Sequence, residues 1–359
     1  MRLTMRSFGA AFFVLVLSVL SGCERPPIET VQTGFRGTAM AQIYNPRKLA
    51  TQVPLNTAPA APEAASADGP KAKDVYQNVK VLGDLSVAQF SRHMVAITQW
   101  VAPEAGCAYC HNVANFADDS KYTKVVSRRM IEMTQRINSD WKQHVAATGV
   151  TCYTCHRGNN IPQQVWYAPK ERKYANGSLG DPAGQNMASK SVGLTSLPFD
   201  PFTPYLLGAA EIRVNGNAAM ALKGAAANRQ STKQAEHTYA LMVHMSESLG
   251  VNCTYCHNSG SFQAWNMSTP QRALSWYGIK MVQHSNENYV TPLGSVLRCR
   301  ATCHNGINKP LYGVSMRAEN PALWPASYSQ SNAPLMGMKG AAAVPAAPAA
   351  PGGGSPAGR

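Results

Sequence analysis

Three segments of this chain have the pattern Cys-x-x-Cys-His, which brings two thiols and an imidazole together. The pattern is typical of covalent haem attachment: the thiols add to the haem vinyl groups, and the histidine becomes the proximal iron ligand. Zinc sites would need further ligands, and redox dithiols would not need the histidine each time. The cysteines are Cys107 and Cys110, Cys152 and Cys155, and Cys253 and Cys256, and the histidines are His111, His156 and His257.

A fourth segment departs from this pattern by one residue. Three residues separate Cys299 from Cys303, and His304 follows. We expect a haem here too, because a longer bridge still reaches both vinyl groups and the flanking sequence is similar. The alternatives are a strained disulfide between the two cysteines or two free thiols. The sequence therefore predicts four covalently bound haem c groups, with His304 as the fourth proximal ligand.

The four segments form two similar pairs. Cys107 and Cys152 are 45 positions apart, and Cys253 and Cys299 are 46 apart. The first segment of each pair ends in His-Asn, and the second continues to a glycine and a proline. A duplicated two-haem unit explains this pattern. We therefore expect a mostly α-helical chain with extensive loops, a multihaem cytochrome c built from two pseudo-symmetric two-haem repeats.

The elements before each segment must supply the sixth iron ligand, which decides whether a haem binds substrate or only carries electrons. Apolar residues at helical spacing predict helices over 89–100, 122–147 and 231–249. A fourth helix is predicted over 270–284, because Thr269 is a good N-cap and a proline follows it.

Methionines on the first three of these helices are the candidates for distal ligands. Met94, Met130 and Met242 each precede one of the regular segments. A methionine on an apolar face more often fills a core, but here one recurs before each segment. Met133 and Met245 lie one turn further on and remain alternatives.

The fourth haem lacks such a methionine. When the repeats are aligned, the position of the second methionine falls near Tyr277 or Gly278. Met281 and His284 are local candidates for the ligand, whereas His144 would have to cross from the first repeat. The remaining histidines are expected at the surface or against haem propionates, and they are His93, His237 and His244.

The N-terminus has the features of a bacterial secretory signal. Two arginines precede an apolar run over 8–20, which is short for a membrane span. The run leads into Leu20-Ser21-Gly22-Cys23, which resembles a lipobox. A diacylated Cys23 would anchor the chain to the membrane. The alternatives are ordinary signal cleavage or a retained anchor with an incidental cysteine.

Composition sets the remaining boundaries. Lys and Arg outnumber Asp and Glu by 33 to 19, but no basic block stands out, so we expect no nucleic-acid partner.

We expect a signal peptide at 1–22, a lipid-anchored extended arm at 23–80, a first two-haem repeat at 81–165, a connecting segment at 166–230, a second two-haem repeat at 231–315, and a tail at 316–359 that is rich in Ala, Pro and Gly and disordered at its end.

Taken together, these residues resemble the tetrahaem cytochrome subunit of bacterial photosynthetic reaction centres over roughly residues 80–315. The resemblance implies three haems with His/Met ligation and a fourth with two histidines, His304 and His144. It also favours Met94, Met130 and Met242 over their neighbours. It places the chain on the periplasmic face of the inner, photosynthetic membrane and agrees with the lipobox.

The resemblance also implies an electron carrier rather than an enzyme. The partners would be the reaction-centre membrane subunits and a soluble donor, either a c-type cytochrome or a high-potential iron–sulfur protein. Electrons would enter at the outermost haem, at the first segment, and leave from the third to the photo-oxidised special pair. Arg272, in a segment that resembles the family's helix start, would lie near that pair; its alternative role is to pair with a propionate.

Apolar residues around the first segment could receive the donor beside Asp118 and Asp119, although they could equally pack the haem crevice. They are Ala105, Ala108, Tyr109, Val113, Ala114 and Phe116.

Two other functions compete with this one. A tetrahaem relay from quinol to a periplasmic reductase usually has a true membrane helix and haems with two histidine ligands. A multihaem reductase or peroxidase needs a haem with an open distal side. The short signal, the abundant methionines and four distal candidates for four haems argue against both.

Overall fold

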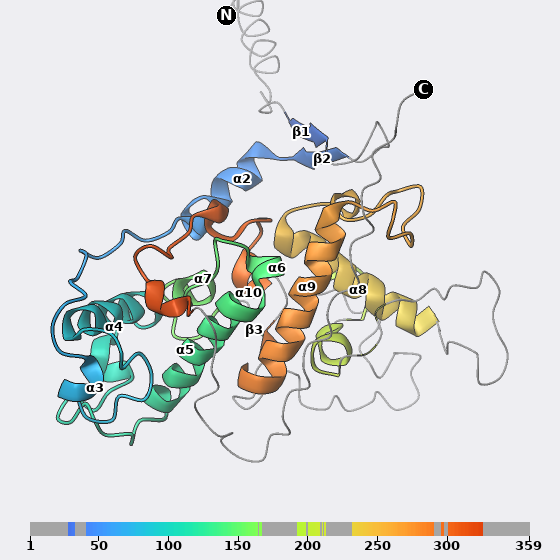
Figure 1. Cartoon of the computed structure of the whole chain (residues 1–359). Coiled ribbons are helices and arrows are strands. Elements are labelled where there is room, and N and C mark those ends of the chain that lie inside the picture. The colour runs from blue at the N-terminus through green and yellow to red at the C-terminus, as the bar shows by residue number, and fades with distance from the viewer. Residues whose placement is uncertain are drawn as a thin grey trace, which may run out of the picture. The chain divides into compact units, whose positions relative to one another are not determined.

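The computed structural model describes residues 28–32, 41–163, 165–166, 192–198, 200–208, 210, 212, 232–290, 296–297 and 301–325. These residues form helices and loops with little strand (Figure 1). The mostly α-helical fold is thereby confirmed. Among them, no helix is both long and apolar enough to cross a membrane. The expected signal peptide, Cys23, Cys299 and the end of the expected tail lie outside the described residues.

The four predicted helices are present. They are α4 (Val87–Val101), α5 (Tyr122–Asp140), α8 (Thr232–Leu249) and α9 (Pro270–Ser285). Ser86 caps α4, because its hydroxyl accepts from the Gln89 amide and the Gln89 side chain returns to the Ser86 amide. Short helical turns carry the cysteine segments: η2 (Gly106–Tyr109), α7 (Cys152–His156), η6 (Cys253–Tyr255) and α10 (Ala301–His304).

One expected helix is shorter than predicted. The pattern over 122–147 is interrupted at Trp141, whose backbone (φ −110°, ψ 32°) ends α5. A separate turn, α6 (Lys142–Val145), follows and carries His144. The apolar pattern continues across the break because Trp141 and Val145 are both buried in the same core. Periodicity alone therefore could not reveal the bend, which redirects α6 against α9.

The segment expected as an extended arm carries short elements. Strands β1 (Glu29–Gln32) and β2 (Ala41–Tyr44) pair antiparallel, and α2 (Pro46–Gln52), η1 (Pro54–Asn56) and α3 (Ala72–Val75) follow. The Gln42 side-chain oxygen accepts a hydrogen bond from the Asn252 backbone N–H at 2.5 Å, next to the third cysteine segment. Asn56 donates to the Asn305 carbonyl at 3.4 Å, next to the fourth. The arm thus contacts the second repeat.

Two apolar clusters stabilise the helices. One joins α5, α6, α8 and α9 to the connecting segment, from which Phe202, Tyr205 and Leu206 are almost fully buried. The other packs α4 against α7 and the residues after the fourth cysteine segment, and in it Trp100 and Leu323 are almost fully buried. The remaining short elements are β3 (Val165–Trp166), which pairs with β4 (Val296–Leu297), the π-helical turns η4 (Thr203–Leu207) and η7 (Asn286–Val290), η9 (Pro310–Gly313) and η10 (Pro321–Leu323).

A buried asparagine ties α5 to the chain entering the second cysteine segment. The Asn138 amide donates to the carbonyls of Val150 (2.9 Å) and Leu323 (2.8 Å), and its oxygen accepts from the Val150 amide (2.7 Å). We expect Asn138→Ala to lower the free energy of unfolding by about 3 kcal/mol, because it leaves buried backbone groups unpaired. Denaturant unfolding followed by circular dichroism measures this, with the exposed Gln143→Ala as control. Equal unfolding midpoints for the two variants would contradict it.

Candidate functional site

The first histidine of each pair is oriented by the loop that follows it. His111 Nδ1 lies 3.4 Å from the Phe116 carbonyl, and His257 Nδ1 lies 2.9 Å from the Phe262 carbonyl. Each phenylalanine also packs its ring on the histidine, with centroids 5.0 and 5.3 Å apart. In both loops the phenylalanine is the fifth residue after the histidine.

The second histidine of each pair uses a tighter turn. His156 Nδ1 lies 2.9 Å from the Asn159 carbonyl, and His304 Nδ1 lies 3.0 Å from the Ile307 carbonyl. The turn needs a left-handed residue directly after each histidine and a left-handed glycine after that. These positions are Arg157 (φ 51°), Gly158 (φ 82°), Asn305 (φ 50°) and Gly306 (φ 86°).

These four hydrogen bonds fix the chemistry of the imidazoles. A carbonyl only accepts hydrogen bonds, so each Nδ1 carries the ring proton, and Nε2 is the nitrogen with a lone pair for a metal. Metal-binding histidines are commonly oriented in this way, by a hydrogen bond from the other ring nitrogen. The sequence had suggested these histidines as ligands but not the carbonyls that orient them. The phenylalanine repeated five residues later was a readable signal; the carbonyls of Asn159 and Ile307 had none.

Two threonines join the cysteine segments to the next helix. Thr123 Oγ1 donates to the Tyr109 carbonyl at 2.5 Å, and Thr269 Oγ1 donates to the Tyr255 carbonyl at 2.6 Å. Thr269 occupies the predicted N-cap position of α9, but its hydroxyl makes this bond instead of capping the helix. The start of each long helix is thus fixed relative to the histidine before it.

The distal candidates differ in burial. Met94, Met130 and Met242 are half-buried, and the last two lie at the edge of the larger core. Their alternatives Met133 and Met245, and also Met281, are buried within that core. Thr98 and Thr134 donate back to the carbonyls of Met94 and Met130, both at 2.8 Å.

His144 is brought close to the fourth histidine. The ring centroids of His144 and His304 are 6.0 Å apart. His144 Nδ1 lies 2.8 Å from the Leu274 carbonyl of α9, so both rings have Nδ1 on a carbonyl. A Cβ atom on Gly278 would lie 2.6 Å from His144 Cε1, so only glycine fits beneath this ring. His284 lies elsewhere, with its ring 6.0 Å from that of Trp141 and Nδ1 3.1 Å from the Asn288 amide.

The second and fourth segments meet. Helices α7 and α10 are neighbours, and Cys155 Sγ lies 3.1 Å from Cys303 Sγ. Arg157 spans the two, donating to the Cys303 carbonyl at 2.8 Å and to the Thr154 carbonyl at 3.3 Å. Nothing in the sequence pattern indicated this contact. Burial raises the pKa of the Cys152 thiol to about 12.

Arg272 is held by the loop after the third segment. Its guanidinium donates to Ser268 Oγ at 2.7 Å and to the Ala264 carbonyl at 3.1 Å, and it stacks over the Trp265 ring at 4.3 Å. The arginine therefore braces this loop.

The donor set fits covalently bound haem. Metal–imidazole bonds of about 2 Å on opposite sides of one ion separate the ring centroids by roughly 6 Å, as found for His144 and His304. The regular segments combine two thiols with an imidazole whose Nε2 faces away from its carbonyl partner. A mostly helical chain with such sites falls in the class of c-type cytochromes.

Comparison with known proteins identifies the group within this class. Residues 24–324 match the family model described as photosynthetic reaction centre cytochrome C subunit. Curated reaction-centre cytochrome c subunits are similar: 50% identity in Rubrivivax gelatinosus (91% of this chain, 92% of the relative) and 49% in Thermochromatium tepidum (89% and 81%). The subunit of Roseobacter denitrificans is 37% identical (88% and 89%). The chain belongs to the family of photosynthetic reaction centre cytochrome c subunits.

Proposed function

We propose that this chain carries four covalently bound haem c groups and re-reduces the photo-oxidised special pair of a reaction centre with electrons from a soluble donor. Family membership supports the electron-transfer role beside the reaction-centre membrane subunits. The proposed number of four haems is supported by one observation: in all four segments, including the irregular fourth, the histidine Nδ1 lies on a backbone carbonyl. When bound, haem iron supplies one-electron chemistry between ferric and ferrous states.

The proposed axial ligands follow from burial and proximity. His111, His156, His257 and His304 are the proximal set. Met94, Met130 and Met242 serve as distal ligands at the first three sites. At the second and third sites the alternatives Met133 and Met245 are enclosed by the apolar core. His144 serves at the fourth site, supported by its 6.0 Å ring separation from His304.

The two repeats explain why the fourth site differs. Met130 lies 26 positions before His156, and Gly278 lies 26 before His304. Glycine at the methionine's position removes that ligand and leaves room for the His144 ring. We assign the two repeats to 81–165 and 231–315. Cys155 and Cys303 are in contact, so the second and fourth segments lie side by side, and we assign them to the middle of the electron path.

The outer sites differ in their surroundings. Beside the first segment, Val113 and Phe116 are 64% and 54% exposed, so an apolar surface is available to a soluble c-type cytochrome or a high-potential iron–sulfur protein. Near the third segment, Phe262, Trp265 and Met267 are also exposed and lie in the loop braced by Arg272. We assign this second surface to the membrane subunits and the electron-transfer interface.

Membrane attachment is proposed from the N-terminal sequence. Residues 1–22 are assigned to a signal peptide, and an acylated Cys23 anchors the arm at 23–80 on the periplasmic face. The connecting segment is assigned to 166–230 and the tail to 316–359. Mass spectrometry of the mature N-terminus tests the anchor, since a diacylated Cys23 and an unmodified one differ in mass.

The function is tested on membranes holding the whole complex, by redox titration of the haem bands combined with flash excitation. We expect several titration steps, four haems per chain, and rapid oxidation of a high-potential haem after the flash, because haem electrons refill the special pair. If no haem is oxidised after the flash, the result would instead favour the quinol-to-reductase relay. Cyanide binding in the unmodified protein would favour a multihaem reductase.

The choice between neighbouring methionines is tested with a matched pair of leucine variants. We expect Met130→Leu to remove an iron ligand, so that one haem becomes high-spin and binds cyanide. Met133→Leu, a core exchange of similar volume, should cost less than about 1.5 kcal/mol and leave the haem spectra unchanged. Absorption and electron paramagnetic resonance spectra measure both. The reverse pattern would assign the ligand to Met133.

Gly278→Ala tests the crossed histidine. The added methyl group would meet His144 at 2.6 Å, although alanine itself favours a helix. We expect the paramagnetic resonance signal of a haem with two imidazole ligands to be lost while the other haems keep theirs. Gly260→Ala, where the nearest side-chain atom is 3.4 Å away, is the control. An unchanged two-imidazole signal in Gly278→Ala would refute His144 as the ligand.

A further inference from the structure

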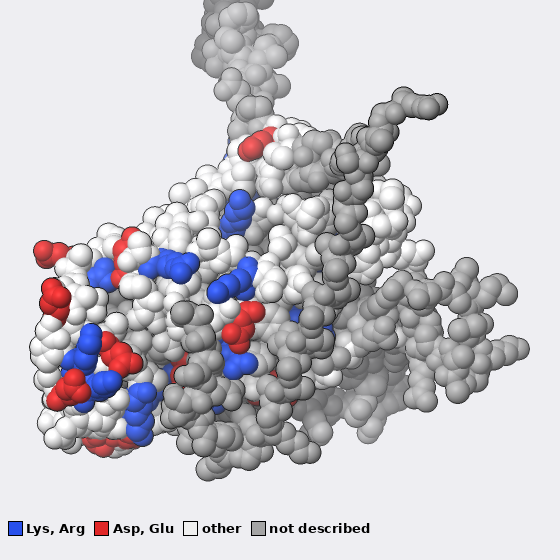
Figure 2. Space-filling view, in the orientation of Figure 1, with Lys and Arg blue, Asp and Glu red and all other residues white. Residues whose placement is uncertain are grey.

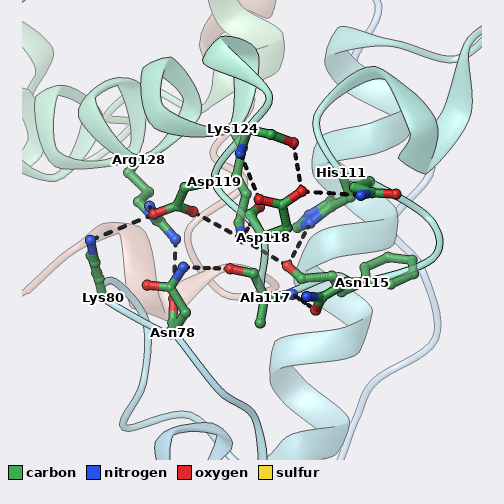
Figure 3. Close-up of polar contacts among 12 residues, drawn as sticks. Asn78, Lys80, His111, Asn115, Ala117, Asp118, Asp119, Lys124 and Arg128 are labelled. Atoms are coloured by element: carbon green, nitrogen blue, oxygen red, sulfur yellow. Dashed lines mark hydrogen bonds and ion pairs between the residues drawn. The ribbon is translucent and has the colours of Figure 1, made fainter.

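A nearly buried lysine lies beside the first histidine. Lys124 is in the first turn of α5, and its side chain is only 7% exposed. Its ammonium group contacts the Phe116 carbonyl at 2.7 Å, the Asp118 carbonyl at 2.9 Å and Asp119 Oδ1 at 3.1 Å (Figure 3). The first two of these contacts are hydrogen bonds, and the third is an ion pair.

Other charges surround this ammonium group. Asp119 also pairs with Arg128 at 2.9 Å and with Lys80 at 3.6 Å, and the hydrogen bond from Arg128, foremost, holds its pKa well below the usual range. Asp118 accepts hydrogen bonds from Ser120 and Asn112. Figure 2 shows charges of both signs intermixed on the surface in the region of α3 and α4. The three cations exceed the two carboxylates, so the cluster keeps a positive charge.

Lys124 shares an acceptor with His111. The Phe116 carbonyl that receives Lys124 is also the one facing His111 Nδ1, at 3.4 Å. In the second repeat, His257 lies closer to its carbonyl, at 2.9 Å. The spacing that relates Thr123 to Thr269 pairs Lys124 with Pro270, which has no ammonium group.

The cation of the second repeat binds different carbonyls. Arg272 donates to those of Gln263 and Ala264, which follow Phe262 in the chain. The shared carbonyl is therefore a feature that distinguishes the first site from the third.

We infer that Lys124 is a positioning residue that raises the reduction potential of the haem at the first site; this rests on the proposed role of His111. A strong acceptor at Nδ1 makes the imidazole a better electron donor and favours ferric iron. An ammonium group on the same carbonyl weakens that acceptor, and its positive charge disfavours the ferric state directly. Both effects stabilise the ferrous form.

The test is redox titration of the complete complex in membranes containing Lys124→Met, with haem content measured in parallel. We expect one of the titration steps to move to lower potential, with about a tenfold change in its equilibrium constant, or about 59 mV for one electron. Lys121→Met is the matched control. Lys121 lies three residues earlier and donates to the Ala108 carbonyl. Its removal deletes the same charge without touching the shared acceptor.

Asp119→Asn separates charge tuning from damage to the loop. Loss of this carboxylate leaves Lys124 less compensated, so we expect the same titration step to rise, whereas a disrupted loop would shift it downward in both variants. Lys124→Arg should retain most of the unmodified potential. The inference is overturned if Lys124→Met leaves the potential of every titration step unchanged, or if Lys121→Met shifts a step by the same amount. It is also overturned if Lys124→Met and Asp119→Asn both shift the step to lower potential. Flash oxidation in the unmodified complex reports separately on the proposed function.

Discussion

The hydrogen bond from histidine Nδ1 to a backbone carbonyl is the contact on which the rest of this structure depends. It selects the tautomer, turns Nε2 away from that carbonyl and determines where the following loop must run. The chain makes it with a five-residue loop after His111 and His257 and with a tight turn after His156 and His304. A backbone acceptor has the advantage that its position is set by the fold and not by a side-chain rotamer.

These carbonyls and their neighbours also accept hydrogen bonds from charged side chains elsewhere in the chain. At the first site a buried lysine contacts the same oxygen as the histidine, and at the third an arginine holds the neighbouring carbonyls. Sites of similar local sequence can therefore differ electronically through residues well separated from the cysteines. Such differences suit an electron carrier, because outer hydrogen bonds tune an iron centre without changing its ligands.

The two halves are interdependent. α6 of the first half packs on α9 of the second, and Gly278 is the position that admits the His144 ring. Arg157 joins the segments around Cys155 and Cys303, and the N-terminal residues Gln42 and Asn56 bond to the backbone beside the second pair of segments. Neither half presents all the contacts around its own histidines without the other.

The sequence by itself predicted the haem segments and determined the four long helices and the family, because cysteine spacing and helical periodicity are local properties. It also showed that Gly278 lies near the position of the missing methionine, but it did not show why a glycine is needed there. Only the tertiary structure decided that α5 ends at Trp141, that Met133 and Met245 belong to the core, and that His144 approaches His304. These features depend on contacts between residues far apart in the chain. A one-dimensional pattern shows that a side chain is apolar or able to ligate, but not which neighbour it meets.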